Sequence, residues 1–283
     1  MNYNIIGAGR LGKNIALALS VHQQINLNSI CNRRYDTAIQ ACHEIGQGKA
    51  VKTITQLPQS DVTWITCNDD AIESVVYQLL CDAVLKPGSF IIHCSGALNS
   101  TLLHPLKELG CSVASFHPLK AFKSGYLDPA AFREIYCVAE GDDLVCKWLH
   151  QIFQPLGAQV LSIQPDEKTK YHAAAAIASN YLITLAHASE ELLLQAGIAQ
   201  THARTMICNL MQGNINNLLH TQRIEETLTG PLCRGDTQTL NMHLKAINNP
   251  KTQALYKTAG LATLAMTDLP EETQIRIEEL LHY

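Results

Sequence analysis

The chain is predicted to fold as an α/β domain with a doubly wound, mostly parallel sheet, followed by an all-helical carboxy-terminal domain. Two observations predict this fold class. Runs of apolar and β-branched residues alternate with helical patterns through residues 1–163, which is typical of parallel strands joined by helices. From residue 164 to residue 283, strand patterns are nearly absent, and alanine, leucine and amide residues dominate. We therefore expect only helices in this second part.

The expected elements follow one another in a regular order. Strands are expected at Tyr3–Ile6, Leu27–Cys31, Val62–Cys67, Phe90–Cys94, Val113–Phe116, Ile135–Ala139 and Val160–Ile163. Helices between them are expected at Lys13–Leu19, Tyr35–Ile45, Ala71–Leu80, Leu102–Leu109 and Leu144–Phe153. A long helix from about Pro165 to Ala196 then ends at Gly197, and further helices are expected at His202–His220, Asp236–Ile247, Lys251–Met266 and Glu271–Leu281. Proline is accepted in the first turn of a helix, and glycine is a common stop signal.

Three glycines lie where the first strand turns into the first helix. Gly7, Gly9 and Gly12 have the spacing G-x-G-x-x-G, with Arg10 and Leu11 between the last two. In this motif the first glycine permits a tight turn, the second lets backbone approach a pyrophosphate, and the third lets the helix pack closely on the strand. The helix amino terminus also presents N–H groups to phosphates. The run predicts a dinucleotide site, in which Arg10 either contacts the ligand or faces solvent.

The end of the second strand indicates which dinucleotide binds. Asn32, Arg33 and Arg34 follow that strand, and no carboxylate stands at its tip. A carboxylate there would bind the ribose diol and repel a 2′-phosphate, whereas guanidinium groups bind the phosphate through charge-assisted hydrogen bonds. These residues therefore favour NADP(H). The alternative is that the two arginines are solvated residues at the start of a helix.

Composition excludes several classes of protein. The chain has 283 residues, which suits two domains, and its net charge of −4 gives no electrostatic case for binding nucleic acid. No leader pattern opens the sequence, and no apolar stretch is long enough for a membrane span. None of the ten cysteines forms a C-x-x-C pair, so we expect buried, reduced thiols and no metal site. The composition predicts a soluble cytoplasmic protein.

Polar residues follow several predicted strands, at the edge where ligands bind in open parallel sheets. Cys67 and Asn68 are expected beside the cofactor. Ser95 and Gly96 offer a hydroxyl and backbone N–H groups to a substrate carboxylate or carbonyl, and His117 is a candidate proton donor or substrate anchor. The alternative for these residues is ordinary turn chemistry.

Three neighbours of these residues are expected to have structural roles. We expect Asp69 and Asp70 to cap a helix. His93 is expected to be a packed histidine at a strand end, hydrogen-bonded to backbone.

A second group of polar residues lies on the expected long helix. His172 lies four residues after Lys168, and Ser179 and Asn180 lie seven and eight residues after His172. These spacings place the four residues along one helix face. Alanines between them leave room for a planar ring, and the polar stripe suits delivery of a proton to a carbonyl or imine. The alternative is a core helix whose polar residues face solvent.

Several motifs together carry a resemblance to a known family. They are the glycine turn with Asn-Arg-Arg, His-Cys-Ser-Gly, Ser-Phe-His-Pro-Leu, the His-Ala-Ala-Ala…Ala-Ser-Asn helix, and Thr-Gly-Pro-Leu-Cys-Arg-Gly-Asp. The chain resembles a bacterial Rossmann-like family with a helical carboxy-terminal domain of unknown function. That family is similar to the 6-phosphogluconate dehydrogenase superfamily, which includes pyrroline-5-carboxylate and ketopantoate reductases. The resemblance implies an NADP-type oxidoreductase that dimerises through its helical domain.

Two positions qualify the resemblance. The hydroxyacid dehydrogenases of that superfamily usually place a helix lysine four residues before an asparagine, but the residue four positions after Lys168 is His172. The proton-transfer group is therefore left open between His172, Lys168 and His117. Arg234, in a glycine- and proline-controlled loop, is expected either to clamp an anionic substrate or to brace a dimer contact, and Asp236 is expected to cap the next helix.

We therefore expect an NADP-binding Rossmann domain at residues 1–163 and a helical substrate and dimerisation domain at residues 164–283. The expected function is an NADP(H)-dependent oxidoreductase that transfers a hydride to or from a small carbonyl, imine or hydroxy acid in the crevice between the domains. Ser95 and Asn180 would orient this substrate, with Gly96, Ser179 and Arg234 also near it. Two alternatives are a non-catalytic NADP(H)-binding sensor or partner protein and a deazaflavin-dependent NADP reductase. We expect a homodimer, with no nucleic-acid or membrane partner.

Overall fold

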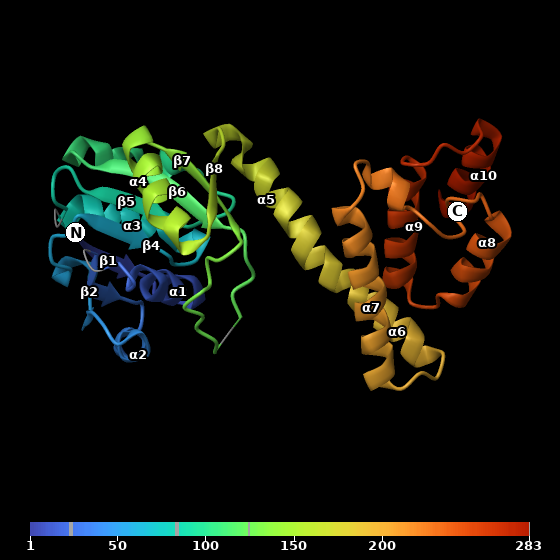
Figure 1. Cartoon of the computed structure of the whole chain (residues 1–283), viewed down its shortest axis with the longest axis horizontal. Helices are drawn as coiled ribbons and strands as arrows, with labels where there is room; N and C mark the ends of the chain where they lie inside the picture. Colours follow the sequence, from blue (N-terminus) through green and yellow to red (C-terminus); the bar gives the residue numbers. More distant parts are fainter. Residues whose placement is uncertain (23–24, 83–84, 124, 283) are drawn as a thin grey trace. The chain divides into compact units, whose positions relative to one another are not determined.

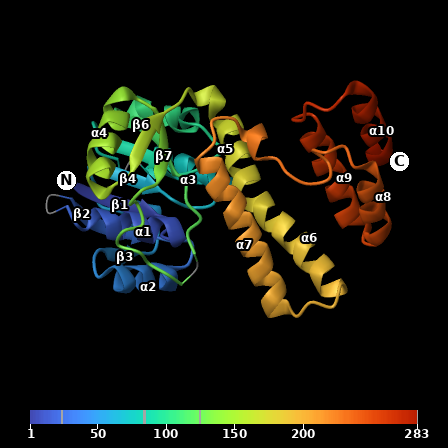
Figure 2. The same ribbon diagram turned by 45° about the vertical axis from the view of Figure 1, so that its right-hand side comes forward.

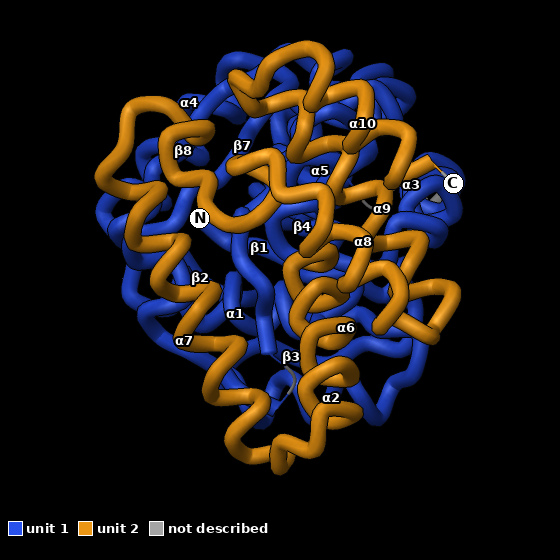
Figure 3. The backbone as a smooth tube through the Cα atoms, turned by 90° about the vertical axis from the view of Figure 1, so that its right-hand side faces the viewer, with its two compact units in different colours: residues 1–179 blue, residues 180–283 orange. Residues whose placement is uncertain are grey.

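The structure is a computed structural model that describes residues 1–22, 25–82, 85–123 and 125–282. It divides into two compact units, Met1–Ser179 (unit 1) and Asn180–Tyr283 (unit 2) (Figures 1 and 3). The boundary expected after residue 163 marks the end of the last strand, whereas the compact units divide later, within a helical segment.

Unit 1 is built on one sheet whose strands in the described residues stand in the order β3-β2-β1-β4-β5-β6-β7-β8. Neighbouring strands are parallel except β6 and β7, which are antiparallel. The order of the first six strands is that of a dinucleotide-binding sheet, and it reverses direction between β1 and β4, where ligands bind in such sheets. The strands are β1 (Asn2–Ile6), β2 (Asn26–Cys31), β3 (Lys49–Val51), β4 (Val62–Ile65), β5 (Phe90–His93), β6 (Ser112–Pro118), β7 (Tyr136–Gly141) and β8 (Gln159–Ser162).

The fold class predicted from the sequence is confirmed, and all seven expected strands are present within two residues at each end. The strand β3 was not predicted, because three residues are too short to show an alternating pattern. The segment η2 (Ser100–Leu109) was expected to be an α-helix but is a 3₁₀-helix. Pro105 lies inside it, and a proline there has no N–H for the α-helical hydrogen bond.

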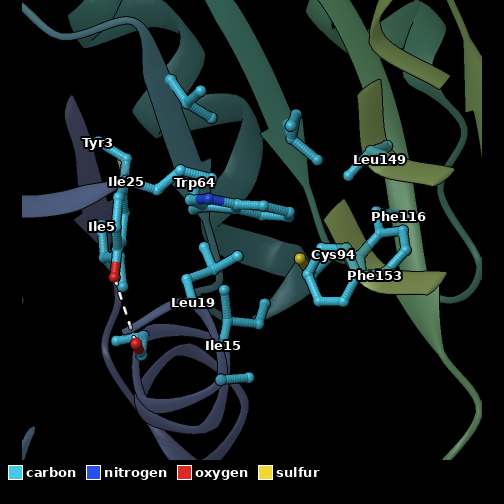
Figure 4. Close-up of a cluster of buried hydrophobic side chains, with 14 of the residues drawn as sticks. Tyr3, Ile5, Ile15, Leu19, Ile25, Trp64, Cys94, Phe116, Leu149 and Phe153 are labelled. Atoms are coloured by element: carbon cyan, nitrogen blue, oxygen red, sulfur yellow. Dashed lines mark hydrogen bonds between the residues drawn. The ribbon is translucent and has the colours of Figure 1, made fainter. Parts of the chain in front are cut away.

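Helices and 3₁₀ segments cover both faces of this sheet (Figure 1). The helices α1 (Arg10–Leu19), α2 (Tyr35–Ile45) and α4 (Asp143–Phe153) bury their apolar residues in one cluster, and α3 (Asp69–Asp82), η1 (Ile54–Gln56) and η2 bury theirs in the other. Trp64 lies in the middle of the first cluster, with the rings of Phe116 and Phe153 at centroid distances of 5.9 and 6.0 Å (Figure 4). Burial on both faces explains why the strands are almost continuously apolar.

The long helix expected from residue 165 to residue 196 is continuous but not uniform. A 3₁₀ turn (Pro165–Glu167) leads into α5 (Lys168–Ala176), a π-helical turn (Ile177–Tyr181) and α6 (Leu182–Gln195). Gly197 then adopts a φ of 84°, which is the stop that the sequence predicted. The π-helical turn contains the boundary between the two units. Because a π-helix rotates less per residue than an α-helix, spacing alone no longer places Ser179 and Asn180 on the face of His172.

Unit 2 contains only helices in its described residues. The helices α6 and α7 (Gln200–Leu219) form an antiparallel hairpin (Figure 2), and α8 (Thr237–Ala246), α9 (Pro250–Leu264) and α10 (Glu271–His282) pack around a small apolar core. Asp236 caps α8, as predicted, because its carboxylate accepts a hydrogen bond from the Thr239 N–H at 3.0 Å. Among the helices that the structure describes, none is long and apolar enough to cross a membrane.

Candidate functional site

The glycine turn between β1 and α1 is tightly packed at its two outer glycines. Gly7 has a φ of +94°, and a Cβ atom there would lie 2.6 Å from the backbone nitrogen of Cys67. A Cβ atom at Gly12 would collide with Thr66 Oγ1 and lie 3.1 Å from the Gly7 carbonyl oxygen. Thr66 Oγ1 also donates a hydrogen bond to that oxygen at 2.8 Å. Packing within unit 1 therefore explains both glycines.

Packing does not explain Gly9. A Cβ atom at this position would meet only the Gly7 carbonyl oxygen, at 3.9 Å. Gly9 precedes the first turn of α1, whose N–H groups have no partner within the helix. Helix amino termini with such free N–H groups bind anions, and the open space at Gly9 leaves this one accessible. The residues of this turn therefore fit the pyrophosphate of a dinucleotide, and Arg10, Leu11 and Gly12 supply the first N–H groups of α1.

The side chain of Asn32, expected near the cofactor, braces the glycine turn. Its Oδ1 accepts a hydrogen bond from the Ala8 N–H at 2.7 Å, and its Nδ2 donates to Thr37 Oγ1 at 3.1 Å. Both polar ends of this amide are therefore used within the protein. Asn32 fixes the turn against the end of β2, a role that sequence reasoning did not assign to it.

Three cationic residues lie at the ends of β2 and β3. Arg33 and Arg34 are exposed directly after β2, and Lys52 directly follows β3, which pairs with β2 up to Cys31 and Val51. The Lys52 ammonium lies 5.5 Å from the centre of the Tyr35 ring, which fixes its place over the start of α2. Sequence reasoning missed Lys52 because it missed β3. The register shows three positive charges at this edge.

The residue Gly96 lies between two histidine rings. A Cβ atom at Gly96 would lie 2.8 Å from His172 Nε2 and 3.0 Å from His117 Nε2. The centres of the two rings are 5.8 Å apart, and the rings are nearly perpendicular. β6 supplies His117 and α5 supplies His172, so two distant segments of unit 1 bring the predicted residues together at one point. The glycine is required here because no side chain fits between the rings.

Several hydrogen bonds of Ser95 fix the loop that begins at this residue. Ser95 Oγ donates to Asp69 Oδ2 at 2.8 Å and accepts from the N–H groups of Ala97 and Leu98. Asp69 was predicted to be a helix cap, but here its carboxylate holds Ser95. The Ser95 N–H donates to Nδ1 of His93 at 3.2 Å.

His93 is a fully buried histidine at the end of β5. Its Nε2 lies 3.1 Å from the carbonyl oxygen of Asn99, which confirms the prediction of a packed histidine bonded to backbone. Burial and, to a smaller extent, the charge of Lys168 lower the pKa of His93 to about 4. The ring is therefore neutral at pH 7 and serves as part of the loop's support.

Lys168 lies beneath the same loop and is almost fully buried. Its ammonium donates to the Ser95 carbonyl oxygen at 2.6 Å and to Ser115 Oγ, and it lies 3.9 Å from Glu140 Oε1. Burial lowers the pKa of Lys168 to about 8, although Glu140 acts in the opposite direction. Glu140 in turn accepts from the N–H and the hydroxyl of Ser100, at 2.8 and 2.7 Å.

Sequence reasoning assigned no role to Glu140, and it placed Ser115 in a polar strand-end segment without giving it a role of its own. The sequence did contain a signal for Glu140, because it is a carboxylate near the carboxyl end of the apolar strand Tyr136–Gly141. Charged residues are rarely fully buried unless they are paired. The pairing with Lys168 explains this position, and it ties β7, η2 and α5 together.

His117 makes a second contact, to Tyr171, the residue directly before His172. Nδ1 of His117 lies 2.9 Å from the Tyr171 hydroxyl oxygen, and the rings meet edge to face. Burial, assisted by the charges of Lys168 and His172, lowers the pKa of His117 to about 4. Tyr171 was missed because a tyrosine between polar helix residues shows no pattern of its own.

The remaining predicted residues have varied surroundings. Cys67 is partly buried against the glycine turn, and burial raises its pKa to about 11, so its thiol is protonated at pH 7. Asn68 is exposed, and its carbonyl oxygen accepts from the Ala71 N–H. Ser179 is exposed in the π-helical turn, and Asn180 and Arg234 are exposed in unit 2. Within the described ranges, no three metal-ligating side chains gather at one point.

Solved structures share this fold. A Bacteroides fragilis protein thought to be an NADP oxidoreductase has a TM-score of 0.76 at 18% identity, covering 93% of this chain and 98% of its own. A protein of Thermotoga maritima has a TM-score of 0.64 at 24% identity, covering 99% and 98%. A pyrroline-5-carboxylate reductase of Coxiella burnetii has a TM-score of 0.59 at 17% identity, covering 99% and 98%. No protein of curated function matches the chain in sequence.

Two family models match the sequence, and together they cover most of it. Residues 1–118 match the Rossmann-like domain, which ends with β6 and the His117-Pro118 pair. Residues 135–263 match a domain of unknown function (DUF2520), which begins at β7 and therefore includes Glu140, Lys168 and His172. The resemblance found in the sequence is confirmed. The chain therefore combines a Rossmann-like domain with this domain of unknown function.

Proposed function

We propose that this protein is an NADP(H)-dependent oxidoreductase that transfers a hydride between nicotinamide and a small carbonyl, imine or hydroxy-acid substrate. The observation that carries the proposal is the pair of histidines on Gly96, at the carboxyl edge of the same sheet that carries the glycine turn. β5 is the second strand from β1 in that sheet, a separation of about 10 Å at ordinary strand spacing. Among the solved structures of the same fold are reductases and dehydrogenases, which supports this class of reaction.

The residues of unit 1 suit three separate tasks. The first turn of α1 would hold the pyrophosphate, and Arg33, Arg34 and Lys52 would bind a 2′-phosphate. The nicotinamide ring, when bound, supplies or accepts the hydride. His117 and His172 would contact the reacting oxygen or nitrogen of the substrate, and the backbone of Gly96 would lie against it. Ser95 would contribute through its hydrogen bond to Asp69, which fixes the loop.

Lys168 has a different part in this proposal from the one that the sequence suggested. Its ammonium is buried and already bonded to Ser95 and Ser115. We therefore propose that Lys168 supports the loop beneath the substrate and does not itself transfer a proton. The two histidines are then the candidates for transferring the proton.

The proposal includes a homodimer formed through unit 2. Large apolar side chains on its hairpin are exposed, including Ile183 at 67%, Leu210 at 70% and Leu219 at 76%. Exposed apolar side chains of this size are the kind that protein contacts cover. Light scattering of the purified chain would measure the oligomeric state, and a monomer at all concentrations would remove this part of the proposal.

The experiment that tests the function combines binding with turnover. Calorimetry should show that NADPH binds, and NADPH oxidation should be followed with a panel of small ketones, cyclic imines and 2-oxo acids. The double variant Arg33→Asp, Arg34→Ala should weaken NADPH binding about 10- to 100-fold, because hydrogen bonds to charged groups are worth about 1.5–3 kcal/mol. NADH binding should change little. Equal loss of both cofactors would contradict the 2′-phosphate assignment, and binding without turnover of any substrate would indicate a sensor.

A further inference from the structure

The two ring nitrogens of His117 lie in different surroundings. Nδ1 lies 2.9 Å from the hydroxyl oxygen of Tyr171, with the two rings edge to face at 5.7 Å. Nε2 lies on the opposite side of the ring, 3.0 Å from the position of a Cβ atom at Gly96. The first nitrogen therefore faces a partner in the protein, and the second faces the point where Gly96 and His172 meet.

A neutral histidine carries one proton, on one nitrogen or the other, and the hydrogen bond at Nδ1 decides which. His117 is neutral at pH 7, because its pKa is lowered to about 4. Tyr171 keeps its proton, because burial raises the pKa of its phenol to about 12. If Nδ1 carried the histidine proton, the phenol proton would have no acceptor among the described residues. The phenol proton therefore has a protein partner only when Tyr171 donates to Nδ1, and a hydrogen bond within the protein is favoured at a half-buried hydroxyl.

We propose that Tyr171 is a positioning residue whose hydroxyl donates to Nδ1 of His117, so that His117 carries its proton on Nε2 and presents an N–H donor beside Gly96 and His172. This inference deepens the proposed function and rests on it for its catalytic consequence. His117 in this form donates a hydrogen bond to the substrate oxygen or nitrogen that gains electron density as hydride arrives. It does not give its proton away, because the product would be an imidazolate. The transferred proton therefore passes through His172, whose side chain is partly exposed.

The chain contains a matched control for this pair. His243 and Tyr256, in unit 2, have the same geometry: Nδ1 lies 2.9 Å from the tyrosine hydroxyl oxygen, and the rings meet edge to face at 5.9 Å. Removing the hydroxyl from Tyr256 therefore breaks the same kind of hydrogen bond in the other unit. A general effect of losing a tyrosine hydroxyl would appear in both variants, whereas an effect on the site would appear only in Tyr171→Phe.

The test is NMR of the full-length protein labelled with ¹⁵N-histidine, in which the His117 signals are identified by their loss in His117→Gln. In the wild type at neutral pH, His117 should show its proton on Nε2, and in Tyr171→Phe it should become a mixture of both tautomers. Tyr256→Phe should leave His117 unchanged. A wild-type ring with its proton on Nδ1, or a Tyr171→Phe ring that stays wholly in the Nε2–H form, would overturn the inference. Because these spectra need no substrate, they do not depend on whether the proposed reaction is found.

Turnover supplies the second measurement. Tyr171→Phe should lower kcat about 10- to 100-fold, by analogy with the loss when the orienting partner of a metal-bound histidine is removed, with a smaller change in KM. Tyr256→Phe should keep wild-type kcat. If the tautomer is as proposed but no substrate is reduced, the proposed function fails and the hydrogen bond remains. If substrate is reduced and Tyr171→Phe has wild-type kcat, Tyr171 does not act through His117 and the inference fails by itself.

Discussion

Replacing Gly96 by alanine is the sharpest single test of the site. The added methyl group would lie 2.8 Å from His172 Nε2 and 3.0 Å from His117 Nε2, well inside van der Waals contact. Gly96 is not among the glycines with a positive φ, so its backbone accepts alanine without strain. The perturbation therefore acts only on the two rings, and at least one of them must move.

The cost should appear in activity more than in stability. Overpacking a tight site costs about 1–3 kcal/mol, and we expect the lower end because the ring of His172 is partly exposed and can swing outward. A displaced proton-handling group loses about 10²- to 10⁴-fold in rate, which equals roughly 3–5 kcal/mol of transition-state stabilisation. We therefore expect kcat/KM for NADPH-dependent reduction to fall at least 100-fold, with a small change in Tm.

Gly46, at the end of α2, provides a control variant that should lose about as much stability as Gly96→Ala. Gly46 has a φ of +77° and no atom within 4 Å of a Cβ position, so Gly46→Ala introduces backbone strain without a clash. The strain costs about 1–2 kcal/mol. This variant should therefore lose as much stability as Gly96→Ala while keeping wild-type kcat/KM. Wild-type activity in Gly96→Ala, or equal losses of activity in the two variants, would refute the placement of the rings on Gly96.

Two further predictions concern the buried polar groups beneath the site. Glu140→Ala should lower the free energy of unfolding in urea by about 3–5 kcal/mol, because it leaves the buried ammonium of Lys168 without its carboxylate. The control Lys107→Ala breaks a half-exposed pair with Asp142 and should cost at most about 1 kcal/mol. Equal costs in the two variants would show that burial does not strengthen the dependence of Lys168 on Glu140. Lowering the pH should also destabilise the fold, because burial and the charge of Lys168 depress the pKa values of His93 and His117 from 6.5 to about 4. Below pH ~6.5 the unfolded chain binds protons on these rings that the folded chain does not bind until about pH 4, so the free energy of unfolding falls through this window by at most about 3 kcal/mol per ring. Urea unfolding measured across this pH range should show that the free energy of unfolding of His93→Gln depends less steeply on pH than that of the wild type. An unchanged pH dependence would exclude a neutral, buried His93.

The sequence predicted those parts of the molecule that depend on neighbours along the chain. The glycine turn, the polar residues after each strand and the change from strands to helices are local patterns, and each has a direct counterpart in the structure. The sequence did not predict β3, whose three residues are a strand only because β2 lies beside them. It also did not predict the 3₁₀ form of η2, since the spacing of its apolar residues suits either helix.

The polar network beneath the site lies beyond local prediction for a related reason. Glu140, Ser115 and Lys168 come from β7, β6 and α5, and their meeting depends on the order of strands in the sheet. A lysine on a helix that begins after the last strand is ordinarily a solvated residue, so its side chain gave no sign of burial. The sequence likewise gave no sign of the role of Tyr171, because this role depends on the contact of its hydroxyl with the ring of His117.

The buried lysine also explains why unit 1 extends past its last strand. β8 ends at Ser162, yet the compact unit continues to Ser179 and includes α5. Lys168 stands at the first turn of α5 and reaches the Ser95 carbonyl oxygen, so it anchors that helix to the loop between β5 and η2. An anchor at the first turn fixes the positions of Tyr171 and His172 one turn later. The hydrogen bond from Lys168 therefore brings the helix residues of the proposed site onto the sheet domain, which is why a boundary drawn at the end of the last strand would separate His172 from His117.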